Sequence, residues 1–295
     1  MDIKTHKISI WKLILLVLNC KQSFLIMKFV ICCLFSLIYH QSQALKPAKN
    51  YLVTPDTFGL NYETLDIPTI DSSLSLKAWK ILPAPADDRK TVVIIAYGDA
   101  GNMSYYLQQA YALVSNGFTV ITFDYRGFGE SSYVPLNEKF LYYNVFATDL
   151  CSVIRWSRTH LKAYKTGVLG FSMGTAMAAM ANQSDPLDFI VAEGLLYNPF
   201  IVSIRINTQK HTEVLIPEGA ERLVEFYSAI TCQLLVFAGT QDLVTTVADS
   251  KIVVKQKKNR KLISFKGNHL QGFEALSKKK YGDKYVEQII RFIGS

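Results

Sequence analysis

From residue 91 onward, short apolar runs alternate with longer segments of helical character. Runs that are apolar on both faces predict buried strands at 91–97, 118–123, 167–171, 189–195, 234–238 and 262–265. Periodicity and composition predict helices at 105–115, 140–160, 173–182, 247–255 and 285–293. Such an alternation predicts an α/β fold: a mostly parallel central sheet, right-handed crossovers and helices on both faces.

Three segments depart from this alternation. Residues 61–68 and 73–82 alternate apolar and polar side chains around Asp71-Ser72, which predicts a hairpin. Residues 45–60 are polar and irregular. Residues 197–230 mix proline, charge and apolar side chains, and they predict a small cap or a connecting pair of helices. We find no low-complexity linker, and we therefore expect one domain from about residue 45 to residue 295.

The first 44 residues form a leader with two apolar runs, each too short to be an ordinary membrane-spanning helix of about 20 residues. From Met27 the pattern is Met-Lys, an apolar core, and small residues at Ser42 and Ala44. This pattern predicts a secretory signal peptide over residues 27–44, and hence a periplasmic or secreted protein that begins at Leu45. The alternative is an uncleaved leader that anchors the protein in a membrane.

The net charge and the cysteine content of the chain exclude few classes of function. The net charge of +8 divides equally between the leader and the remainder, where lysines gather at 255–261 and 278–280. No nucleic-acid motif accompanies these lysines, so we interpret them as solvated helix faces and expect no nucleic-acid partner. Outside the leader, Cys151 and Cys232 are the two cysteines. They lack metal-ligand spacing, and we expect buried free thiols rather than a disulfide.

The segment that most clearly indicates a catalytic function is Gly170-Phe171-Ser172-Met173-Gly174. It joins a predicted strand to a predicted helix that is rich in small residues. A sharp strand-to-helix turn puts Ser172 in a strained backbone conformation with its hydroxyl at the tip. Gly170 and Gly174 lack Cβ atoms, so neighbouring backbone can approach. The pattern predicts a nucleophilic serine.

Ligands of such sheets bind beyond the carboxyl ends of the strands. At these ends the sequence places Ser172, Asp242 and His269, which together could carry out nucleophilic catalysis. A serine is a weak nucleophile unless a base takes its proton, and His269 follows a core strand at the correct edge. Asp242 follows the preceding strand, where a carboxylate can orient the imidazole. The order Ser172, Asp242, His269 is that of serine hydrolases built on this type of sheet.

The tetrahedral intermediate of such a reaction needs two backbone N–H donors for its oxyanion. One should be Met173, the residue after the nucleophile. The other should come from the loop after the strand at 91–97, most plausibly from Asp99.

Together these motifs resemble the α/β-hydrolase superfamily, in its serine-aminopeptidase-like and monoacylglycerol-lipase-like branch. The resemblance extends from about Asn61 to Ser295, and it implies an α/β-hydrolase fold with a small cap and no metal or organic cofactor. The oxyanion loop of that family usually begins His-Gly, and here Tyr97 stands in place of the His. The motifs that carry the resemblance are Tyr97–Asn102, Asp124–Ser131, Gly170–Gly174, Gly239–Asp242 and Gly267–His269.

The resulting expectation is a serine hydrolase, esterase-like or lipase-like, that cleaves an ester, thioester or amide of a small-molecule acyl substrate. A dehalogenase or epoxide hydrolase of this fold would need a carboxylate at position 172, where the chain has Ser172. Two alternatives stay open. The same triad would serve an acyltransferase or a peptidase, and Tyr97 is the one feature that favours a catalytically weak binding protein.

Overall fold

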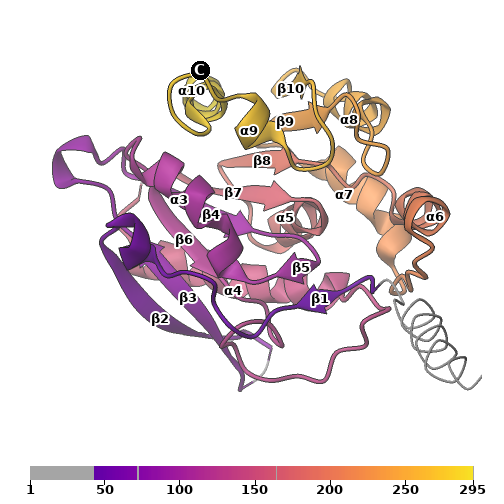
Figure 1. The fold of residues 1–295 in the computed structure, drawn as a ribbon, viewed down its shortest axis with the longest axis horizontal. Helices are drawn as coiled ribbons and strands as arrows, with labels where there is room; N and C mark the ends of the chain where they lie inside the picture. Colours follow the sequence, from indigo (N-terminus) through magenta and orange to yellow (C-terminus); the bar gives the residue numbers. More distant parts are fainter. Residues whose placement is uncertain (1–42, 72, 164, 295) are drawn as a thin grey trace, which may run out of the picture. The chain divides into compact units, whose positions relative to one another are not determined.

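The computed structural model describes residues 43–71, 73–163 and 165–294 (Figure 1). Most of the predicted signal peptide, residues 27–42, lies outside the described residues. Among the residues that are described, no helix has the length and apolar character needed to cross a membrane.

The central sheet has eight strands in the order β10-β9-β8-β7-β4-β6-β3-β2. The neighbours from β10 to β6 pair in parallel, whereas β3 pairs antiparallel with both β6 and β2. This arrangement confirms the predicted fold class and the predicted hairpin. The bounds are β2 Tyr62–Pro68, β3 Ser75–Ile81, β4 Thr91–Ala96, β6 Thr119–Phe123, β7 Lys165–Phe171, β8 Phe189–Glu193, β9 Gln233–Gly239 and β10 Arg260–Phe265.

Helices cover both faces of the sheet (Figure 1). Helix α4 packs against α5, and α5 packs against α7, whereas α3 contacts α10. The central strands β4 and β6 are buried along their whole length, as strands covered on both faces must be. The bounds are α3 Leu107–Val114, α4 Tyr143–His160, α5 Met173–Ser184, α6 Pro199–Lys210, α7 Leu223–Ala229, α8 Val247–Val254, α9 Gly272–Ala275 and α10 Asp283–Ile293.

The sequence pattern does not predict several short elements of the structure. Strand β1, Lys46–Pro47, pairs in parallel with β5, Ala100–Gly101, and the two form a separate small sheet. Helix α9 follows His269. The remaining short elements are the 3-10 turns η1 Pro55–Phe58, η2 Pro85–Asp87, η3 Met103–Tyr106 and η4 Ala220–Arg222.

The predicted cap segment divides between two roles. Helix α6 begins at Pro199, where the Asn198 side chain accepts hydrogen bonds from the amides of Phe200 and Ile201. Helix α7 instead belongs to the layer that covers the sheet, because it packs on α5 and its Tyr227 is fully buried. The cap of this domain is therefore essentially α6.

Two expectations about polar side chains need adjustment. Cys151 and Cys232 are free thiols, as predicted, but Cys232 is half-buried rather than buried. The basic run at 255–261 is not uniformly solvated: the Arg260 guanidinium is buried and donates to the carbonyls of Val253, Tyr227 and Ile230. Arg260 therefore connects α8, α7 and β10 as a structural residue.

Candidate active site

Ser172 lies at a sharp turn between β7 and α5. Its backbone has φ 50° and ψ −116°, a conformation that costs free energy for a residue with a side chain. The turn closes because Gly174 approaches the end of β4: a Cβ atom built on Gly174 would lie 1.9 Å from the carbonyl oxygen of Ala96. The Ser172 amide also donates to the carbonyl of Glu193, at 2.9 Å.

The structure brings Ser172, His269 and Asp242 together in one hydrogen-bonded chain. The Ser172 Oγ lies 3.0 Å from His269 Nε2, and His269 Nδ1 lies 2.7 Å from Asp242 Oδ2. The three side chains come from the loops after β7, β9 and β10, at neighbouring carboxyl ends of parallel strands. This arrangement allows His269 to take a proton from Ser172 while Asp242 holds the imidazole.

Asp242 is almost fully buried, and its surroundings favour the carboxylate. Its Oδ1 accepts hydrogen bonds from the amides of Val244 and Thr245. Burial raises the pKa of the Asp242 carboxyl, but the hydrogen bond and positive charge of His269 and the bonds from Thr245 outweigh burial and hold this pKa below its ordinary value. Asp242 is therefore ionised at neutral pH.

Thr245 is a member of the site that sequence reasoning missed. Its hydroxyl donates to Asp242 Oδ2 at 2.6 Å and lies 3.1 Å from His269 Nδ1, and its side chain is fully buried. The signal was present in the sequence, since a threonine three residues after an aspartate can close a local turn around the carboxylate.

The loop that was predicted to carry the second oxyanion donor passes beside Ser172. A Cβ atom built on Gly98 would lie 3.5 Å from Ser172 Cβ. Helix α5 begins at Met173, whose amide has no acceptor within the helix because it belongs to the first turn. Met173 is thus next to Ser172, and Gly98, the residue before Asp99, approaches it. The oxyanion role of Met173 and Asp99 stays a prediction.

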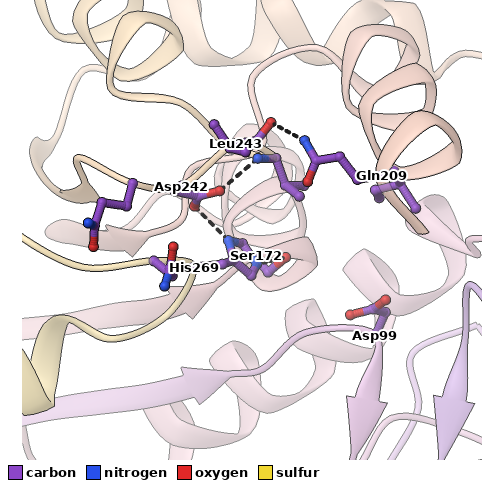
Figure 2. A pocket seen from close by; sticks show the side chains of 10 residues that line it. Asp99, Ser172, Gln209, Asp242, Leu243 and His269 are labelled. Carbon is purple, nitrogen blue, oxygen red and sulfur yellow. Dashed lines mark hydrogen bonds and ion pairs between the residues drawn. The ribbon is translucent and has the colours of Figure 1, made fainter.

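A pocket of about 250 Å³ opens beside the nucleophile. Figure 2 shows Asp99 across this pocket from Ser172 and His269, and Gln209 of α6 above it. The Gln209 side chain donates to the carbonyl of Leu243 at 3.0 Å, which connects α6 to the loop after β9. The lining residues are Asp99, Ser172, Ile206, Gln209, Gln241, Asp242, Leu243, Val244, Asn268 and His269.

The aromatic side chains of Tyr105, Tyr106 and Phe128, which lie in the segments after β4 and β6, do not line this pocket. Tyr105 points to solvent and is 49% exposed, whereas Phe128 is fully buried in the core. The side chains from the cap segment that line the pocket are Ile206 and Gln209.

Glu193 is a buried carboxyl next to the site. Its Oε1 accepts a hydrogen bond from the amide of Gly272, which follows the His269 loop, at 2.6 Å. Burial raises the pKa of Glu193 to about 7, although the bond from Gly272 and the positive charge of His269 oppose this shift. Glu193 therefore fixes the backbone that follows His269, whereas Asp242 is the carboxylate that bonds to the imidazole.

Other candidate residues lie away from this chain of hydrogen bonds. Asp249 caps α8 through Thr246 and forms an ion pair with Arg205. His160 stacks on Trp156 at the end of α4, and His211 ends α6. Within residues 43–294, no three His, Cys, Asp or Glu side chains converge in a way that would hold a metal ion.

Comparison with known proteins agrees with this geometry. A family model described as the alpha/beta hydrolase fold matches residues 91–188, and a model described as serine hydrolase (FSH1) matches residues 157–278. The chain therefore has the α/β-hydrolase fold. Its place in the serine-aminopeptidase-like or monoacylglycerol-lipase-like branch of that superfamily stays a prediction.

Among curated proteins, the chain is similar to the uncharacterized protein YfhR of Escherichia coli O157:H7. The two are 29% identical over 237 residues, which is 76% of this chain and 78% of YfhR. Among solved structures, the esterase Pf2001 of Pyrococcus furiosus is 20% identical, with a TM-score of 0.66, over 84% of this chain and 98% of the esterase. An α/β serine hydrolase without lid from Xanthomonas campestris has a TM-score of 0.55 at 15% identity, over 83% and 97% of the two chains.

Glu193 should make the free energy of unfolding of this protein depend on pH. Its folded pKa of about 7 lies above the ordinary value of 4.5, so between these values the native state keeps a proton that the unfolded chain releases. This contribution to stability is complete below the ordinary pKa and is lost as the pH rises through about 7. Glu193→Gln cannot titrate, so its stability relative to wild type should increase from about pH 5 to about pH 8.

Urea unfolding of wild type and Glu193→Gln at these two pH values measures the difference. The exposed Glu225→Gln is the matched control, and its difference from wild type should stay constant. A Glu193→Gln difference that is equally constant would contradict a raised pKa of Glu193.

Proposed function

We propose that this protein is a serine hydrolase that cleaves a carboxylic ester, thioester or amide through an acyl-enzyme. The observation that carries the proposal is the continuous chain from Asp242 through His269 to Ser172, with the nucleophile at a strained turn. Such strain persists where surrounding structure maintains it, and it is frequent at active sites.

In the proposed reaction, Ser172 Oγ attacks the acyl carbon while His269 Nε2 takes the hydroxyl proton. Asp242 keeps the other imidazole nitrogen protonated and stabilises the imidazolium. The amides of Met173 and Asp99 donate to the oxyanion, and His269 then protonates the leaving group. Water, activated by His269, releases the acyl group and restores Ser172.

The size of the pocket favours a small acyl or alcohol group. Pockets that enclose a drug-sized ligand measure roughly 300–1,000 Å³, and the pocket beside Ser172 measures about 250 Å³. Its lining mixes the amides of Gln209, Gln241 and Asn268 with aliphatic side chains. Among the esters we therefore favour those with short acyl chains.

One structural detail weakens the case for a catalytically inert binding protein. That alternative depended on Tyr97, which stands where related loops usually have a histidine. The Tyr97 side chain is fully buried, and its hydroxyl donates to Asp124 Oδ1 at 2.9 Å. The loop is thus fixed by a different side chain, so the missing histidine no longer favours the binding protein. Acyl transfer and peptide cleavage remain the alternative reactions for the same triad.

The central test is covalent modification and turnover. A fluorophosphonate probe should label wild type and the control Ser203→Ala, whose hydroxyl bonds within α6, but not Ser172→Ala. Wild type should also hydrolyse p-nitrophenyl esters, with short acyl chains preferred to long ones. Labelling that survives Ser172→Ala, or a wild type that neither reacts nor turns over, would refute the proposal.

The acid of the triad can be assigned by three substitutions. Asp242→Asn should keep the fold but lower kcat by about 10⁴-fold, as loss of the corresponding carboxylate does in serine proteases. Asp249→Asn and Glu193→Gln should lower kcat far less, because neither carboxylate contacts His269. The kcat of each variant on one activated ester, with circular dichroism as the folding check, gives the answer. Near-full activity of Asp242→Asn beside a loss in Asp249→Asn or Glu193→Gln would show that Asp242 is not the acid.

We further propose that the enzyme acts outside the cytoplasm after cleavage behind Ala44. The sequence pattern of residues 27–44 is the support for this proposal. N-terminal sequencing of exported protein should begin at Leu45. Recovery of the intact leader in the membrane fraction would instead support an anchored enzyme.

A further inference from the structure

Residues 46–52 lie along the predicted oxyanion loop, residues 97–103, and bond to its backbone. We call residues 46–52 the N-terminal strap. The Lys46 amide donates to the carbonyl of Asp99 at 2.7 Å, and the Ala48 amide donates to the carbonyl of Gly101 at 2.9 Å. These bonds form the parallel pairing of β1 with β5. The carbonyl of the predicted donor residue Asp99 is therefore bound directly by the strap.

Asn102 at the end of the loop is bound to the strap through its side chain. Its Nδ2 donates to the carbonyls of Ala48 and Asn50, at 3.2 Å and 2.8 Å, and the side chain is fully buried. Its Oδ1 accepts from the amide of Ser104, whose hydroxyl in turn accepts from the amide of Leu52. The strap thus contacts the loop at its middle and at its end.

A buried carboxylate joins the strap to both ends of the loop. Asp124 Oδ1 accepts from the Tyr97 hydroxyl at 2.9 Å and from the Met103 amide at 2.7 Å. Asp124 Oδ2 accepts from the hydroxyl of Tyr51, the strap residue, at 2.7 Å. Gly129 leaves room for this carboxylate, since a Cβ atom there would lie 1.9 Å from Oδ2. One side chain therefore fixes where the loop begins, where it ends and where the strap lies.

We propose that the N-terminal strap sets the position of the oxyanion loop, and that Tyr51, acting through Asp124, is a positioning residue for the reaction of Ser172. The inference rests on the proposed serine-hydrolase function. Tyr51 does not line the pocket beside Ser172, so its effect on the reaction passes through the loop. Oxyanion stabilisation depends on donor position in the transition state, so a displaced loop lowers kcat and leaves KM nearly unchanged.

The chain offers a closely matched control for Tyr51→Phe. Tyr51 and Tyr62 both pack on Trp79, and both hydroxyls donate to an aspartate. The acceptor of Tyr62 is Asp56 in the turn η1, which has no hydrogen bond to the oxyanion loop in the part of the chain that the structure describes. Loss of the hydroxyl is thus the same chemical change in both variants, and only Tyr51→Phe affects Asp124.

Tyr51→Phe should lower kcat on a p-nitrophenyl ester about tenfold, since misplacement of a group by about 1 Å can cost up to about 100-fold. The KM of this variant and the kcat of Tyr62→Phe should remain close to wild type. The defect should also be smaller on the matching thionoester, because sulfur accepts hydrogen bonds weakly and gains less from the oxyanion donors. A role in stability alone would not change the ratio of ester to thionoester turnover.

Amide hydrogen exchange provides a second measurement that needs no turnover. Exchange at residues 99–103 should be faster in Tyr51→Phe than in Tyr62→Phe, because the strap no longer bonds to Asp124. Equal exchange together with equal kcat in the two variants would overturn the inference, as would equal defects on ester and thionoester. A wild type that neither reacts with the fluorophosphonate probe nor turns over esters would instead refute the proposed function. The exchange data would still decide whether the strap holds the loop.

Discussion

The close approach of the Ser172 turn to β4 is the constraint on which the site depends. Without a Cβ atom at Gly174, helix α5 can begin directly against the carbonyl of Ala96. Ser172 is then held at positive φ with its hydroxyl 3.0 Å from His269, while the Met173 amide opens the helix beside it. The positions of Ser172, of the predicted oxyanion donor Met173 and of the adjoining loop at Gly98 all follow from this one packing of backbone on backbone.

Two buried carboxylates hold different parts of the site. Asp242 holds His269, whereas Asp124 holds the predicted oxyanion loop, and the charges around the two carboxylates differ. Asp242 faces the imidazole of His269, a partner that becomes positive in the proposed reaction, and the pKa of Asp242 lies below the ordinary value. Asp124 is bonded to neutral donors, so burial dominates and raises its pKa to about 6. In the proposed mechanism, the Asp242 carboxylate stabilises the positive charge that forms on His269. The Asp124 carboxylate instead holds backbone and hydroxyl groups in place.

The sequence predicts the parts of the molecule that depend on local patterns. Strand runs, helix periodicity and the Gly-x-Ser-x-Gly motif gave the sheet, the layers and the turn at Ser172, and the positions of Asp242 and His269 followed from strand ends. The strap, β5 and the buried role of Arg260 were not predictable in this way. The two-residue strands β1 and β5 are too short to show a periodic pattern. The partners of Arg260 lie in α8 and at the end of α7, and the contacts with α7 join segments about 30 residues apart in the sequence. The division of residues 197–230 between α6 and α7 also depends on which surface each helix covers.

The predicted oxyanion loop therefore depends on contacts between segments that are distant in the sequence, and the turn at Ser172 does not. The predicted oxyanion loop derives its position from residues 46–52 and from Asp124, whereas the turn at Ser172 follows from residues adjacent in sequence. Contacts between distant segments carry a cost in loop-closure entropy, and a terminal segment that has lost one bond opens more readily than a core strand. In the proposed mechanism, the nucleophile and its base can thus remain assembled while the oxyanion donors become displaced. Docking of the strap is then a separate requirement for activity, beyond formation of the sheet and the triad.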